Sequence, residues 1–100
     1  MSDEFSQAPD VVRAHVVVHG TVQGVAFRAY VRHHAQRLNL HGWVKNLPSG
    51  QVELEVEGGP DVVNVFLPFL HDGPSLAHVE RVDVNWVAVM HDVTPFEIRR

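Results

Sequence analysis

The chain has 100 residues, the size of one small domain, and it contains no cysteine, so disulfides, thiolate metal sites and cysteine nucleophiles are excluded. Its net charge of −4 provides no general positive field for nucleic acid. No apolar run approaches the ~20 residues that a membrane-spanning helix needs. We therefore expect a cytoplasmic monomer that binds neither nucleic acid nor membranes.

The first ten residues are polar and acidic, and they lack the basic start and apolar centre of a signal peptide. We interpret residues 1–10 as a flexible tail and residues 11–100 as the folded domain. The eight histidines show neither an HExxH pattern nor a spacing supported by carboxylates. We expect them on the surface or partly buried, and we expect no metal site.

Valine alternates with polar residues in residues 11–19, which predicts a half-buried strand. The period then changes to three and four residues, which predicts a helix over residues 25–38. A strand over residues 41–47, a Pro-Ser-Gly turn and a partner strand over residues 51–57 form a predicted hairpin. In the partner strand, Glu53, Glu55 and Glu57 alternate with apolar residues, so we expect them on a solvated face rather than in a metal cluster.

Pro60 suits the first turn of a second helix, whose broad apolar stripe ends before Gly73. Pro68 lies inside this stripe, where it removes a hydrogen bond, so we expect a kink there or an early end of the helix. The alternation of apolar residues over residues 78–89 predicts a long strand with Val82, Val84 and Trp86 directed inward. A short last strand is expected over residues 96–99.

The main elements thus follow the order strand, helix, strand, strand, helix, strand. This order is typical of the split βαβ arrangement, also called ferredoxin-like. We expect an α+β fold in which two helices cover one face of an antiparallel four-stranded sheet.

The most informative segment is the corner between the first strand and the first helix, residues 20–28. The first turn of a helix carries unpaired N–H groups and a partial positive charge, which together attract anions. Gly20 and Gly24 allow tight backbone conformations, and Arg28 can reach back with a bidentate guanidinium group. The spacing therefore fits a phosphate site, although a tight turn followed by a surface arginine has the same pattern.

The corner closely resembles the first signature of the acylphosphatase family, and a second signature of that family follows at the expected distance. The resemblance covers residues 11–99. The first signature reads here Gly20-Thr21-Val22-Gln23-Gly24-Val25-Ala26-Phe27-Arg28. The second reads Gly42-Trp43-Val44-Lys45-Asn46, followed by Gly50, Val52 and Gly58.

The resemblance implies a ferredoxin-like fold and the hydrolysis of acyl phosphates to carboxylate and inorganic phosphate, with no metal and no cofactor. It implies that Arg28 binds the phosphoryl oxygens and that Asn46 positions the attacking water. It also implies a backbone cradle for the phosphate, made of Val22, Gln23, Gly24, Val25, Ala26 and Phe27.

Two further side chains lie within the signatures, those of Gln23 and Lys45. The Gln23 side chain fits either a brace for the loop or a surface position. Lys45 neighbours Asn46 on a strand, so it faces the opposite side and is expected in solvent.

The main alternative function is a non-catalytic module of the same fold that binds phosphate or carbamoyl phosphate. The resemblance motivates it, because such domains also occur within larger maturation proteins. A nucleic-acid binder is a third possibility, because split βαβ sheets can display stacking aromatic residues. The acidic charge balance and the absence of an aromatic ribonucleoprotein signature disfavour it.

Overall fold

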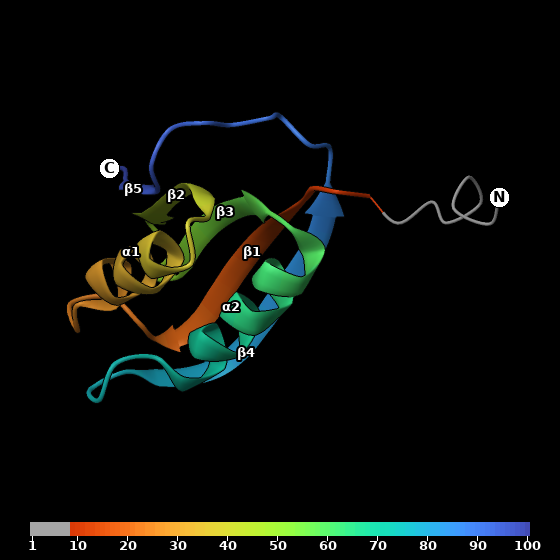
Figure 1. Cartoon of the computed structure of the whole chain (residues 1–100). Coiled ribbons are helices and arrows are strands. Elements are labelled where there is room, and N and C mark those ends of the chain that lie inside the picture. The colour runs from red at the N-terminus through yellow and green to blue at the C-terminus, as the bar shows by residue number, and fades with distance from the viewer. Residues whose placement is uncertain (1–8) are drawn as a thin grey trace, which may run out of the picture.

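A computed structural model describes residues 9–100, and residues 1–8, most of the predicted tail, lie outside the described part of the chain. Within residues 9–100, two helices and five strands form the domain (Figure 1). In chain order they are β1 (Val12–Thr21), α1 (Phe27–Arg37), β2 (His41–Asn46), β3 (Val52–Gly58), α2 (Pro60–Asp72), β4 (His78–Val87) and β5 (Glu97–Ile98). Neither helix within residues 9–100 has the length and apolarity to cross a membrane.

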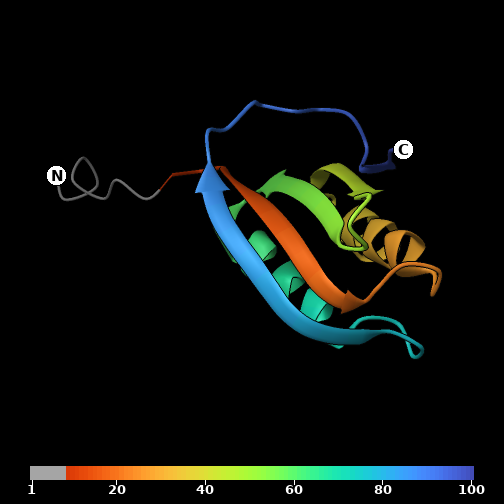
Figure 2. The same ribbon diagram turned by 180° about the vertical axis from the view of Figure 1, so that it is seen from behind.

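The strands form one sheet in the order β4-β1-β3-β2-β5. Both helices cover the same face, and Figure 2 shows the opposite face without a helical layer. The predicted ferredoxin-like α+β fold is confirmed. One detail of the prediction is wrong: the sheet is mixed, because β5 adds a fifth strand that pairs in parallel with β2.

The core lies between the sheet and the helices. The alternation predicted for β1 and β3 is present, because Val16 pairs with Leu54 in antiparallel register and both side chains are fully buried. Phe27 from α1, Phe66 from α2 and Phe96 from the segment before β5 are the largest buried side chains. Each such burial stabilises the fold by about 1.5–3 kcal/mol relative to an exposed side chain.

β1 is longer than predicted and continues to Thr21 through an irregularity between His19 and Gly20. Gly20 has φ of 130°, and a Cβ built there would lie 2.1 Å from the His78 carbonyl oxygen. The glycine therefore permits the close approach of β1 and β4. It does not contribute to the corner loop, to which the sequence pattern assigned it.

Pro68 does not end the second helix early, because α2 continues to Asp72. Pro68 is exposed, and so is Asn64, whose carbonyl group loses its helical partner. Water can hydrate a carbonyl group on the solvent side of a helix, so the proline is tolerated there. The apolar stripe formed by Val63, Phe66 and Leu70 remains continuous against the sheet.

Trp86 has the predicted direction but is not buried. Trp86 is 56% exposed, although it shares the helix-covered side of β4 with Val82 and Val84. Both of these valines are half-buried and pack against the core. The alternation of β4 is therefore as predicted, but the packing that buries Val82 and Val84 does not extend to Trp86.

The solvated position predicted for all three glutamates of β3 is wrong for Glu57. Its side chain is 2% exposed, as is that of Arg13, whose Nη1 donates to Glu57 Oε1 at 3.0 Å. The N–H groups of Met90 and Asp92 also donate to the Glu57 carboxylate, each at 2.9 Å. Burial alone would raise the pKa of Glu57, but the hydrogen bonds from Met90, Arg13 and Asp92 together lower it below its usual value.

We predict that Glu57→Gln lowers the free energy of unfolding by about 1–3 kcal/mol at neutral pH, because a charge-assisted hydrogen-bond cluster is weakened. Since the pKa of Glu57 is lower in the folded than in the unfolded chain, its contribution is present above the unfolded pKa. It is lost as the pH falls through the folded value. Urea unfolding from neutral pH to about pH 3 should therefore show the two proteins converging on the acid side. Glu80→Gln, on an exposed residue of β4, is the control, and an equal effect of both substitutions would contradict the prediction.

Candidate active site

The corner between β1 and α1 is a loop of residues 22–26 whose flanking side chains are fixed in the core. Val22 and Phe27 are each 1% exposed, whereas Gly24 and Ala26 between them are exposed. The loop is therefore held at both ends, and its middle presents mainly backbone to the surroundings.

Two residues of this loop adopt left-handed backbone conformations. Gly24 has φ of 76°, and a Cβ built on it would meet no atom within 4 Å, so conformation rather than packing requires glycine there. Ala26 has φ of 64° and ψ of 25° and forms the N-cap of α1 without a side-chain hydrogen bond. A left-handed alanine costs about 1–2 kcal/mol, which the rest of the fold must offset.

These conformations leave backbone donors available. Within residues 9–100, the N–H groups of Gly24, Val25 and Ala26 donate to no protein acceptor, and the first α1 hydrogen bond into the loop runs from Tyr30 N–H to Ala26 O. Unpaired N–H groups beside a helix N-terminus carry partial positive charge. This part of the loop can therefore donate to an anion.

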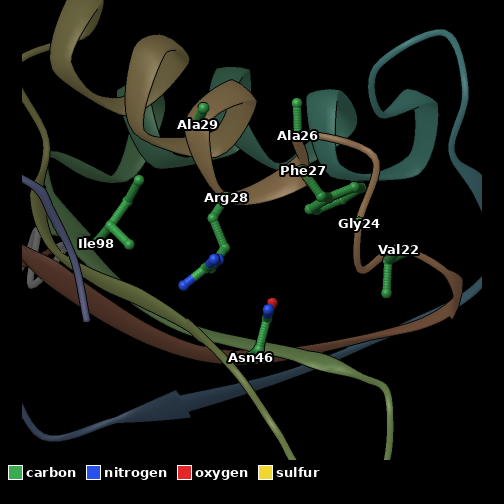
Figure 3. Close-up of a pocket in the computed structure, with 8 residues that line it drawn as sticks. All are labelled: Val22, Gly24, Ala26, Phe27, Arg28, Ala29, Asn46 and Ile98. Atoms are coloured by element: carbon green, nitrogen blue, oxygen red, sulfur yellow. The ribbon is translucent and has the colours of Figure 1, made fainter. Parts of the chain in front are cut away.

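Arg28 and Asn46 lie across one pocket from each other (Figure 3). Arg28 is the second residue of α1, and Asn46 is the last residue of β2. The pocket has a volume of about 190 Å³, below the roughly 300–1,000 Å³ typical of pockets for drug-sized ligands. Eight residues line it: Val22, Gly24, Ala26, Phe27, Arg28, Ala29, Asn46 and Ile98.

The Arg28 guanidinium group is not engaged by an acidic side chain. In the part of the chain that the structure describes, no Asp or Glu lies within 4.0 Å of it. Its side chain is half-buried and directed into the pocket (Figure 3). A partly desolvated arginine without a carboxylate partner is well suited to bind an oxyanion in a bidentate manner.

Asn46 reaches the pocket because of its place in the alternation of β2. It shares the helix-covered side of the strand with Gly42 and Val44, whereas Lys45 faces the other side, where its Nζ lies 3.6 Å from Glu53 Oε1. The Asn46 Oδ1 atom is buried and has no hydrogen-bond partner among the described residues. An unsatisfied buried acceptor costs about 1–3 kcal/mol, so it marks a position that a small polar group can fill.

The predicted site residues are only partly brought together by the fold. Arg28 and Asn46 meet at the pocket with Val22, Gly24, Ala26 and Phe27. The two other predicted residues do not line the pocket: Val25 packs against the core, and the Gln23 side chain donates to the β2–β3 hairpin.

Ala29 and Ile98 complete the lining of the pocket, and neither was among the site residues predicted from the sequence. Ala29 follows Arg28 directly in the first turn of α1. The predicted helix over residues 25–38 was therefore a signal that could have placed Ala29 beside the site. Ile98 reaches the pocket only because β5 pairs with β2, with Ile98 opposite Val44. The pattern predicted this last strand but gave no sign of its partner.

The histidines do not form a cation site in the described part of the chain, where no three His, Asp or Glu side chains converge. Several are paired individually: His15 Nε2 lies 2.7 Å from Glu53 Oε2, and His34 stacks on Phe69 with ring centroids 4.0 Å apart. Burial lowers the pKa of His34, as do the nearby charges of His33 and Arg37. These histidines therefore belong to the surface and to packing contacts.

Comparison with known proteins identifies the family of this chain. The sequence model of the acylphosphatase family matches residues 14–98. An acylphosphatase of Anaeromyxobacter dehalogenans is 49% identical over 90 residues, which are 90% of this chain and 97% of that relative. The structure of an acylphosphatase from Coxiella burnetii superposes with a TM-score of 0.85 and 41% identity, over 90% of this chain and 94% of that one.

A larger protein contains a similar domain. The structure of full-length HypF in its phosphate- and nucleotide-bound form matches with a TM-score of 0.81 and 29% identity, over 94% of this chain but 12% of that one. The similarity to the two acylphosphatases, by contrast, covers nearly their whole length. The chain therefore belongs to the acylphosphatase family of enzymes, which hydrolyse acyl phosphates.

Proposed function

We propose that this chain hydrolyses small acyl phosphates by direct attack of a water molecule that Asn46 positions, while Arg28 and the loop backbone hold the phosphoryl group. The observation that carries this proposal is the buried Asn46 Oδ1 atom, which has no hydrogen-bond partner among residues 9–100. It shares one small pocket with the Arg28 guanidinium group, which no acidic side chain of those residues engages. A site for an anion and a site for water are thus adjacent.

Charge stabilisation comes from two sources in this proposal. The N–H groups of residues 24–26, which have no acceptor within the described chain, and the first turn of α1 donate to phosphoryl oxygens from the loop side. Arg28 approaches from the helix with a fork of donors that matches two of these oxygens. Phosphoryl transfer needs mainly such positioning and charge stabilisation, since its transition state has little covalent chemistry for the protein to assist.

The Asn46 carboxamide accepts a hydrogen bond from the attacking water but does not remove its proton, because an amide is not a base at neutral pH. The water oxygen forms a bond to phosphorus while the bond from phosphorus to the acyl oxygen breaks. The electron pair of that bond leaves with the carboxylate. Both protons of the water finish on the phosphate, so a dianionic acyl phosphate gives one carboxylate and one dihydrogen phosphate.

The leaving group explains why a site with so few functional groups is sufficient. Its conjugate acid has a pKa of about 4, so it departs without protonation by a general acid. With Arg28 and backbone donors at the phosphoryl group, the protein's own residues provide the positive charge that a metal ion supplies in other phosphoryl-transfer sites. We therefore propose that the reaction needs no metal and no covalent intermediate.

The alternative, a non-catalytic module for phosphate or carbamoyl phosphate, is motivated by the similarity to part of HypF. The identity of 49% to an acylphosphatase over 97% of its length favours the enzyme. Binding of phosphate without turnover would instead identify the module.

We predict steady hydrolysis of acetyl phosphate and benzoyl phosphate by the purified chain, with the same rate in the presence of EDTA. The physical reason is that Arg28 and the backbone amides carry the positive charge at the site. Release of inorganic phosphate measures the rate. Turnover equal to that of the uncatalysed reaction would rule out the enzyme, and loss of activity in EDTA would rule out the metal-free site.

Arg28→Ala should lower kcat/KM by about 10³-fold or more, because it removes the side-chain charge that faces the phosphoryl group in the transition state. The measurement is the steady-state rate with benzoyl phosphate. Arg37→Ala, on an exposed arginine in the last turn of the same helix, is the charge-matched control and should keep the wild-type rate. Similar losses in both variants would indicate an effect of net charge rather than a site at Arg28.

Asn46→Ala should lower kcat by about 10²–10³-fold, while inhibition by inorganic phosphate is largely kept, because the substitution removes the partner of the water rather than that of the phosphoryl group. Competitive inhibition by phosphate reports on the phosphoryl site separately from turnover. Asn85→Ala, on an exposed strand asparagine, is the matched control. A parallel loss of phosphate inhibition and kcat would assign Asn46 to phosphate binding instead.

A further inference from the structure

Gln23 belongs to the loop of residues 22–26, here called the phosphate loop, but its side chain does not line the pocket. Its Nε2 atom donates to the Leu47 carbonyl oxygen at 2.7 Å and to the Gln51 carbonyl oxygen at 2.8 Å. A carboxamide nitrogen has two N–H groups, so both are used. The side chain therefore has no donor left for a phosphoryl oxygen.

The two acceptors of Gln23 belong to the first and last residues of the turn between β2 and β3, Leu47 and Gln51. Leu47 N–H donates to Gln51 O at 2.9 Å, and Gly50 N–H donates to Leu47 O at 3.1 Å. Each carbonyl group thus accepts one hydrogen bond from the turn and a second one from Gln23, which uses both of its lone pairs. The loop is consequently joined to both ends of the turn that connects β2 and β3.

Leu47 directly follows Asn46, so this junction lies one residue from the side chain proposed to hold the attacking water. Among the described residues, the Gln23 hydrogen bonds are the only side-chain hydrogen bonds between residues 22–26 and the hairpin. The buried side chains of Val22 and Phe27 fix the ends of the loop in the core, but they do not bond it to β2.

We infer that Gln23 is a positioning residue that sets the separation between the phosphate loop and Asn46. This inference rests on the function proposed above. Attack in line with the departing carboxylate requires phosphorus and the water oxygen to be held within about 0.5 Å of the productive geometry. A misplacement of about 1 Å can cost about 10²-fold in rate.

The first test compares Gln23→Ala with Gln23→Glu. Gln23→Ala should lower kcat by about 10- to 100-fold, while the inhibition constant of inorganic phosphate changes by less than about threefold. Gln23→Glu keeps the shape but places a carboxylate against two carbonyl oxygens, so its loss of kcat should be at least as large. A wild-type rate for Gln23→Glu would overturn the inference, as would a rise of the phosphate inhibition constant in proportion to the loss of kcat.

The second test is a double-mutant cycle with Asn46→Ala. If Gln23 acts by placing the loop relative to Asn46, Gln23→Ala should change kcat by less than about threefold once Asn46 is already removed. Additive losses in the double mutant would overturn the inference. If Asn46→Ala alone is fully active, Asn46 does not position the attacking water and the proposed mechanism is wrong. When Asn46→Ala is impaired but the cycle is additive, only the role of Gln23 fails.

A matched control separates positioning from a general loss of stability. Gln36 also donates its side-chain Nε2 to a backbone oxygen, that of Phe96 at 2.9 Å, and the buried ring of Phe96 keeps this segment in place without it. Gln36→Ala should therefore keep kcat. Circular dichroism at the assay temperature measures the folded fraction of each variant.

Gln23→Met, which keeps the length but has no donor, replaces Gln23→Glu in the comparison if that variant does not fold.

Discussion

The site depends on one constraint, which is that the chain turns from β1 into α1 without satisfying the N–H groups of the turn. Gly24 and Ala26 adopt left-handed conformations, and neighbouring backbone donors have no acceptor within the described part of the chain. An arrangement of this kind is costly unless an anion or water completes it. The burial of Val22 and Phe27 on either side holds the turn in this conformation, so the core maintains a loop that local energetics alone would not favour.

The register of the sheet is the second requirement. Asn46 faces the pocket because β2 pairs with β3 so that Val44, two residues earlier, opposes Leu54 in the core. A shift by one residue would exchange Asn46 for Lys45, which at present pairs with Glu53 on the other face. The apolar alternation that folds the sheet therefore also selects the side chain that enters the site. The hydrogen bonds of Gln23 then join the loop to the turn that directly follows this strand.

Most of the fold could be predicted because the information is local. Alternating valines in β1 and β3 and the change of period at α1 determine the element order, and two signature segments identified Arg28 and Asn46 as a pair. The remaining features depend on contacts between distant segments. Ile98 lines the pocket through the parallel pairing of β5 with β2. Glu57 is buried and accepts hydrogen bonds from Arg13 and from the N–H groups of Met90 and Asp92, which lie far away in the sequence. Trp86 has the predicted direction, but no pattern in β4 reveals that the packing around Val82 and Val84 does not reach it.

In the proposed reaction, water attacks phosphorus directly within one pocket, with no intermediate attached to the protein. The stereochemical course at phosphorus tests it most directly, with an acyl thiophosphate made chiral by oxygen isotopes and hydrolysed in water of the remaining isotope. A single in-line displacement inverts the configuration at phosphorus, so our account predicts inversion. Retention would require two successive displacements through a group of the protein, and it would contradict the roles proposed for Asn46 and Arg28.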